Sequence, residues 1–247
     1  MGLIKSPDEI EKIVRAGVVV HTTLDLLHQD TKVGMTTRDL DFRTRELLKL
    51  FNATPVLLGY KGFPGSICIS VNEEIIHGVP GNRKINNGDL VSLDLAATVE
   101  GYNADSAITF VVGQRVDPAV DRLLKGTESA LMAGIAEAKP GNHIGDISNA
   151  IQIEAEFHGL ALIPEFGGHG IGKELHERPY ISNVGLPHTG ELIEEGMVLA
   201  IEPMALLGLG GFRILKDGWT VVSTDNSLSA HFEHTVAITA TGPVILT

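Results

Sequence analysis

The chain has 247 residues, enough to bury a sizeable apolar core in one large domain or two small ones. With 19 Lys and Arg against 31 Asp and Glu, its formal net charge of −12 argues against a nucleic-acid partner, because phosphate backbones are bound by excess positive charge. The single cysteine, Cys68, excludes an internal disulfide, and we see neither a signal peptide nor the ~20-residue apolar run that spans a bilayer. We therefore expect a cytoplasmic protein without a membrane partner.

The first half of the chain predicts two helices followed by strands. The capping pattern of residues 6–9 starts a helix of about 7–28, and Thr36 or Thr37 can cap a second helix that Pro55 must end. Alternating, β-branched segments predict three strands, at 66–72, 89–99 and 102–112. Glu100-Gly101 fits a hairpin turn between the last two.

The second half repeats this order. Asp117-Pro118 opens a helix, and after a Lys-Pro-Gly turn a further helix runs to about His158 before more strand-like segments. The turn at Gly34 recurs 107 residues later at Gly141. Other landmarks recur at offsets of 107 or 108: Asp39 and Asp146, Gly88 and Gly196, Asp94 and Glu202. His77 and His176 each stand three residues before a proline, upstream of the strands that carry Asp94 and Glu202. We predict an α+β fold and one domain, 1–247, whose pseudo-symmetric helix-helix-strand halves, about 1–113 and 114–247, join in one curved sheet.

Four carboxylates lie in apolar, strand-like segments, at Asp94, Asp105, Glu202 and Glu233. Asp94 and Asp105 flank the hairpin turn at similar distances, so they can be cross-strand neighbours. Burying such charges is costly, and a divalent cation would compensate them. Two alternatives are a protonated or arginine-paired carboxylate in the hairpin and an ordinary edge-strand glutamate at Glu202, which Pro203 keeps extended.

His169 lies in a glycine-rich stretch, 165–179, which we interpret as a loop that brings an imidazole close to a site. The glycine spacing does not fit a dinucleotide-binding fingerprint, and a structural or surface histidine is the alternative. Near the C-terminus, His231 and Glu233 share one face of a predicted strand, which does not fit the helical H-x-x-E-H motif. Four carboxylates and one imidazole suit a pair of Mn, Fe, Co or Zn ions, which can activate water for amide hydrolysis.

Five segments together resemble the motifs of type I methionine aminopeptidases, in metallopeptidase family M24. They span residues 62–80, 88–107, 167–179, 201–204 and 216–235. The resemblance implies a pita-bread fold with one curved antiparallel sheet. It also implies removal of the N-terminal methionine of nascent polypeptides, by attack of a metal-bridging water on the first peptide bond. The expected partners are nascent chains and the ribosome, and the expected oligomeric state is a monomer.

The resemblance also implies residue roles. Asp105 and Glu233 would bridge two divalent ions, Asp94 would complete one site, and His169 with Glu202 the other. Glu202 would also carry a proton, while His77 and His176 would contact the scissile amide and stabilise the oxyanion. The substrate would be bound by His77, His176, Tyr60, Phe63, Cys68 and Trp219. Structural hydrogen bonds and ordinary core packing are the alternatives for these six residues.

Three residues depart from the pattern that the resemblance leads us to expect: Leu57, Lys61 and Leu175. They put the shape of the methionine pocket in question, but not the metal site. Two other functions compete with this one. An Xaa-Pro aminopeptidase would prefer proline at the second position, and a catalytically silent peptide-binding module would not bind divalent ions.

Overall fold

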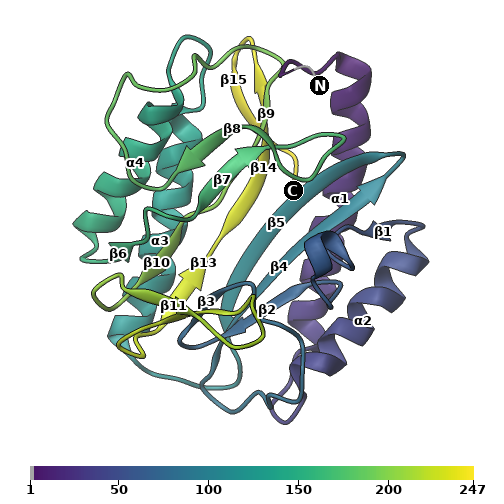
Figure 1. The fold of residues 1–247 in the computed structure, drawn as a ribbon, viewed down its shortest axis with the longest axis vertical. Helices are drawn as coiled ribbons and strands as arrows, with labels where there is room; N and C mark the ends of the chain where they lie inside the picture. The colour runs from purple at the N-terminus through teal and green to yellow at the C-terminus, as the bar shows by residue number, and fades with distance from the viewer. Residues whose placement is uncertain (1–2) are drawn as a thin grey trace.

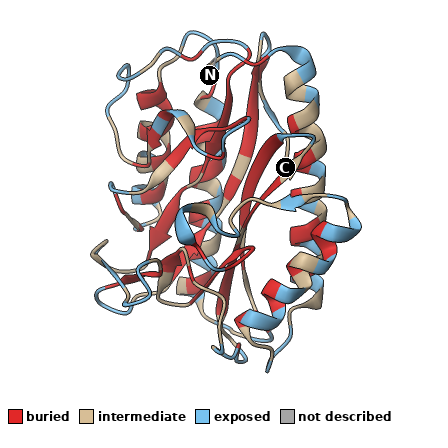
Figure 2. Ribbon diagram, turned by 45° about the vertical axis from the view of Figure 1, so that its right-hand side comes forward, coloured by how far each residue is buried: buried red, intermediate tan, exposed pale blue. Residues whose placement is uncertain are grey.

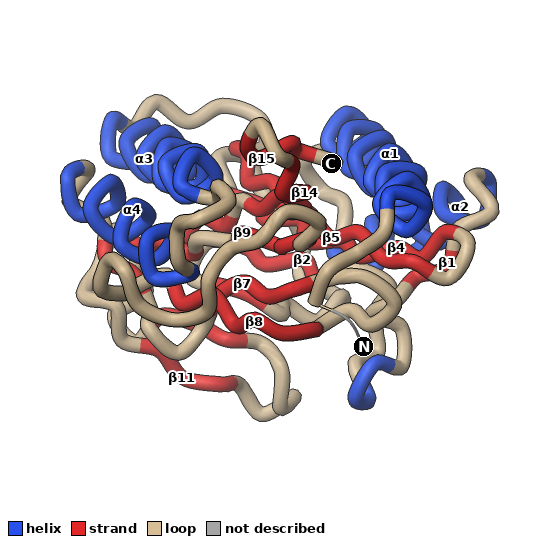
Figure 3. Tube along the Cα trace, turned by 90° about the horizontal axis from the view of Figure 1, so that it is seen from above, coloured by secondary structure: helices blue, strands red, loops and turns tan. Residues whose placement is uncertain are grey.

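The computed structural model describes residues 3–247 and contains two pairs of helices, all on one side of a large sheet (Figures 1 and 3). The first pair is α1 (Pro7–Asp30) and α2 (Thr37–Leu50), and the second is α3 (Pro118–Glu137) and α4 (Ile144–Phe157). The helix starts follow the predicted caps: Ser6 Oγ accepts from the N–H of Glu9, and Thr36, not Thr37, caps α2. A single 3₁₀ turn, η1 (Tyr60–Gly62), follows the first pair.

The large sheet is antiparallel throughout and has nine strands. Its main path runs β1 (Thr54–Pro55), β4 (Leu90–Val99), β5 (Tyr102–Val111), β14 (Glu233–Thr239), β9 (Val198–Ile201), β7 (Gly167–Gly170) and β8 (Glu177–Ser182). β2 (Cys68–Val71) pairs with β4, and β15 (Gly242–Ile245) pairs with β14. The predicted curved antiparallel sheet and α+β class are therefore confirmed.

Two three-stranded sheets, which the sequence did not predict, flank the large one. The first contains β13 (Ser229–His231), β10 (Met204–Leu206) and β6 (Ala161–Leu162). The second contains β11 (Phe212–Ile214), β12 (Val221–Ser223) and β3 (Glu74–Ile76). Their strands are two or three residues long, which is too short for an alternating pattern to be recognised.

The duplication inferred from spacing recurs in backbone contacts. An isolated bridge joins Thr36 to Lys84 in the first half, and its counterpart joins His143 to Leu192 in the second. Gly34 N donates to Ile85 O at 2.8 Å, and Gly141 N donates to Ile193 O at 3.0 Å. Gly88 and Gly196, the residues six before Asp94 and Glu202, both have a φ of +87°. The two halves thus start their central strands with the same backbone conformation.

The two faces of the large sheet have different partners. Alternate residues of β4, such as Leu93 and Leu95, are fully buried against α1 and α2. A second apolar cluster fills the space between α3, α4 and strands β9 and β14. Buried residues follow the central strands along their length (Figure 2). Asp94, between Leu93 and Leu95, points to the face that the helices do not cover.

None of the helices within residues 3–247 has the length and apolar character needed to cross a lipid bilayer.

The β4–β5 register places the two aspartates of the hairpin on one face of adjacent strands, as predicted. Asp94 lies opposite Ala107 and Asp105 opposite Ala96, so the two aspartates are diagonal neighbours on one face and not a direct pair. The predicted turn, Glu100-Gly101, forms with positive φ at both residues, as a tight two-residue hairpin requires.

Candidate metal centre

Strand pairing places several of the predicted residues in one row across the sheet. Cys68 lies opposite Asp94, Asp94 opposite Ala107, and Ala107 opposite Glu233. Paired residues of an antiparallel sheet share a face, so both carboxylates lie on the open side with only a methyl group between them. Asp105, two residues before Ala107, points to the same side.

Glu202 reaches this row from a break between strands, and not from within a strand as predicted. It follows β9 and precedes β10, because Pro203 has no N–H for the ladder and the chain passes there from the large sheet to a smaller one. A matching break at Phe232 separates β13 from β14. His231 and Glu233 nevertheless keep the alternation predicted for them.

His169 lies in strand β7 and not in a loop, which corrects the prediction made from its glycine-rich surroundings. Its neighbours must be glycine because the adjacent strands approach closely: a Cβ on Gly168 would lie 2.1 Å from Ala200 O, and one on Gly170 would lie 2.1 Å from Arg178 O. The Nδ1 of His169 lies 2.9 Å from Gly170 O. Since a carbonyl only accepts, Nδ1 carries the proton and Nε2 keeps a free lone pair.

The donor atoms form two overlapping triads. Those of Asp105, His169 and Glu233 lie within 4.8 Å of one another, and so do those of Glu202, His231 and Glu233. Asp94 lies outside both triads, beside Cys68. Within residues 3–247, Asp105 Oδ1, Glu233 Oε1 and His231 Nε2 are buried without a hydrogen-bond partner. Glu233 thus lies where two neighbouring sites would meet.

The electrostatics of this cluster favour a bound cation. Burial raises the pKa of all four carboxyl groups, and for Asp105, Glu202 and Glu233 the charges of other carboxylates raise the pKa further. Burial also lowers the pKa of His169 to about 3, which leaves its imidazole neutral and able to bind a metal. Buried, unpartnered oxygens and a free nitrogen lone pair fit a divalent metal, which would neutralise charges that otherwise repel.

The predicted catalytic and substrate-binding residues surround this cluster. The ring of His176 lies 4.2 Å from that of His169, and its Nδ1 lies 2.8 Å from Tyr60 Oη. Phe63 and Trp219 meet edge to face at 5.3 Å. The ring of His77 lies 6.2 Å from that of Trp219, and equally far from that of Phe166, which the sequence did not single out. The aromatic side chains thus form a wall beside the carboxylates.

The histidines of this wall are neutral near pH 7. Burial lowers the pKa of His77 to about 4. Burial and the nearby Lys61 ammonium lower the pKa of His176 to about 4. Burial also raises the pKa of the Cys68 thiol, helped by the charges of Asp94 and Asp105. Cys68 is therefore a neutral, buried thiol without the thiolate character of a nucleophile.

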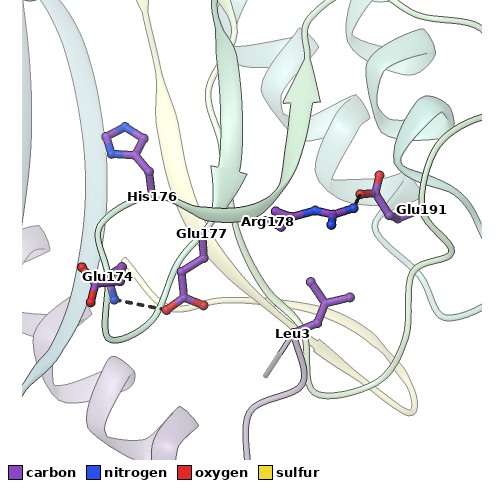
Figure 4. Close-up of a pocket in the computed structure, with 6 residues that line it drawn as sticks. All are labelled: Leu3, Glu174, His176, Glu177, Arg178 and Glu191. Atoms are coloured by element: carbon purple, nitrogen blue, oxygen red, sulfur yellow. Dashed lines mark hydrogen bonds and ion pairs between the residues drawn. The ribbon is translucent and has the colours of Figure 1, made fainter. Parts of the chain in front are cut away.

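A cavity of about 490 Å³ is lined in part by His176 (Figure 4). Its other lining residues are Leu3, Glu174, Glu177, Arg178 and Glu191. Arg178 pairs with Glu191 at 2.9 Å, while the His176 ring points away from Glu174 and Glu177 (Figure 4). This charged lining does not suit an apolar side chain.

Together, the fold and the buried donor cluster define a metal-binding α+β protein. Residues 11–240 match metallopeptidase family M24. The methionine aminopeptidase of Clostridium acetobutylicum is 44% identical over 248 residues, covering 100% of this chain and 99% of that protein. The crystal structure of methionine aminopeptidase from Thermotoga maritima superposes with a TM-score of 0.96 at 41% identity, covering 99% of this chain and 98% of that one.

The chain therefore belongs to metallopeptidase family M24 and, within it, to the type I methionine aminopeptidases. Its fold is the pita-bread fold, and its cofactor is a divalent metal. The prolidase from Pyrococcus furiosus has the same fold, with a TM-score of 0.78 at 24% identity, but this chain covers only 65% of it.

Proposed function

We propose that the protein removes the N-terminal methionine of nascent polypeptides, with two divalent ions of Co, Mn, Fe or Zn held by Asp94, Asp105, His169, Glu202 and Glu233. The observation that carries this proposal is the buried cluster with unpartnered oxygens on Asp105 and Glu233, in a chain with full-length similarity to methionine aminopeptidases. Bound ions would supply a more acidic water and a Lewis acid for the amide carbonyl. The remaining chemistry falls to the side chains around them.

His176 is suited to donate a hydrogen bond to the carbonyl oxygen of the scissile amide. Tyr60 Oη lies 2.8 Å from its Nδ1, and if the hydroxyl donates there, the single proton of the neutral ring sits on Nε2. His77, also neutral, contacts the same amide from the aromatic wall. Glu202 is the proposed proton carrier, because its carboxylate lies in the donor cluster, 3.5 Å from His169 Nε2, where the scissile amide would be held.

The methionine side chain is proposed to lie against Tyr60, Phe63, Cys68 and Trp219. A neutral thiol and three aromatic rings suit an unbranched thioether, since sulfur makes favourable contacts with ring edges. We further propose one catalytic domain, 1–247, because both apolar cores pack on the same sheet. Action on nascent chains also leads us to propose a cytoplasmic monomer that works at the ribosome.

Removal and return of metal tests the function. The chelator-stripped protein should not cleave Met-Ala-Ser, and one or more of Mn, Co, Fe and Zn should restore release of methionine. Leu-Ala-Ser and Ala-Pro-Ser should remain uncleaved. Release of alanine from Ala-Pro-Ser would instead indicate a proline-directed peptidase, and no release with any ion would favour a peptide-binding module.

Replacing His176 with alanine is expected to lower kcat by roughly a hundredfold or more, the usual cost of losing one oxyanion donor. KM for Met-Ala-Ser should change little, because the donor acts mainly on charge that develops in the transition state. Tyr60→Phe removes only the hydroxyl that orients the ring and should have a smaller effect. Equal losses in the two variants would argue that Tyr60 Oη, and not His176, contacts the substrate.

A further inference from the structure

His231 is a buried imidazole that the proposed ligand set does not use. It is 1% exposed and ends strand β13, opposite Met204 of β10. Thr109 clamps its backbone: His231 N donates to Thr109 Oγ1 at 2.9 Å, and that hydroxyl is 2.7 Å from His231 O. Its backbone is therefore fixed beside the metal centre, while its Nε2 has no hydrogen-bond partner within residues 3–247.

The carboxylate of Glu202 lies within ion-pair distance of this nitrogen. His231 Nε2 lies 3.5 Å from Glu202 Oε2, and His169 Nε2 lies 3.5 Å from Glu202 Oε1. The two imidazoles thus flank the carboxylate, one at each oxygen. Because Glu202 occupies a break between strands, its position depends on such side-chain contacts more than that of a residue within a ladder.

We propose that His231 is a positioning residue whose Nε2–H holds Oε2 of Glu202, leaving Oε1 directed toward His169 and the metal. A neutral imidazole has one N–H, and pointing it at a carboxylate is favourable, whereas pointing the lone pair there would be repulsive. Hydrogen bonds that orient a ligand are typically worth 10- to 100-fold in metal affinity. This inference rests on the proposed role of Glu202 as a ligand.

The test measures the dissociation constant of the stripped protein for Co(II), from its visible absorption. His231→Leu, which has no donor, should bind Co(II) about 10- to 100-fold more weakly than the wild type. His231→Gln keeps an N–H at similar reach and should stay within about threefold of the wild type, because the hydrogen bond would survive. If the leucine variant fails to fold, His231→Asn, whose amide is too short to reach Glu202, should show the same weakening.

A matched control lies three residues further on. His234 points to the opposite face of the sheet, where its Nδ1 lies 3.0 Å from Thr247 Oγ1, so His234→Gln should leave Co(II) affinity unchanged. Wild-type affinity in His231→Leu would overturn the proposal. So would equal weakening in His231→Gln and His231→Leu with a changed Co(II) spectrum, since His231 would then be a direct ligand. Failure of the wild type to bind Co(II) would instead contradict the proposed ligand set.

Discussion

Glu233→Gln is expected to lower kcat/KM for Met-Ala-Ser by more than about a hundredfold. Changing a group that only orients a metal ligand typically lowers metal affinity or activity by about 10- to 100-fold, and loss of a ligand should cost more. Glu233 belongs to both donor triads, and its Oε1 is buried without a hydrogen-bond partner within residues 3–247. A neutral amide there removes one negative charge from both donor triads. Metal affinity, measured by calorimetry on the stripped protein, should fall along with activity.

The same substitution should make the metal-free protein more stable. Burial and the charges of Asp105, Glu202 and Asp94 raise the pKa of Glu233, so the folded state binds a proton more tightly than the unfolded state. A raised carboxyl pKa means that stability falls as pH rises from the unfolded pKa through the folded one. The Tm of the metal-free wild type should therefore fall as the pH rises above the ordinary glutamic-acid pKa of 4.5, and fall less in Glu233→Gln.

An exposed acid provides the control for this experiment. Glu195→Gln changes the net charge equally but lies on the surface, so neither its activity nor the pH dependence of its Tm should depart from the wild type. A Glu233→Gln protein that binds metal as tightly as the wild type would remove Glu233 from the ligand set. We expect Glu233→Gln to be more stable and less active than the wild type, because functional sites often retain charges that destabilise the fold.

Local chemistry made the helices and the longest hairpin predictable. Capping residues such as Ser6 and Thr36 mark the helix starts, and the alternation of Leu93, Asp94 and Leu95 marks a strand with different surroundings on its two faces. The carboxylates stood out for the same reason, because an acid in an apolar strand requires a partner. Each of these signals lies within a few residues of the chain.

Features set by distant strands were not predictable in this way. His169 belongs to a strand only because β8 and β9 approach the glycines on either side of it, and no short pattern specifies that approach. His231 was noted on the same face as Glu233, but its contact with Glu202 depends on the pairing of β13 with β10. Phe166 reaches His77 through equally distant packing. The buried carboxylates were therefore easier to predict than the residues around them.

The close approach at His169 leads to the second large prediction: Gly168→Ala should destabilise the protein by about 3 kcal/mol or more, at the upper end of overpacking costs. Its Cβ would lie 2.1 Å from Ala200 O and 3.1 Å from Ala200 C, which are backbone atoms of a paired strand that no rotamer change can move away. Strand β7 would have to separate from β9. For a chain of this size the Tm should fall by roughly 10 °C, measured by calorimetry on the metal-free protein.

Gly81→Ala is the control for Gly168→Ala, because it replaces a glycine by alanine without creating a steric clash. A Cβ at Gly81 would meet only Val79 O, at an ordinary 3.8 Å, and its φ lies outside the left-handed region. That variant should change stability by less than about 1 kcal/mol, in the stabilising direction, because alanine restricts the unfolded chain. Because His169 follows Gly168, the strand shift in Gly168→Ala should also weaken Co(II) binding. Wild-type stability and affinity in that variant would mean that β7 can move without disturbing the metal centre.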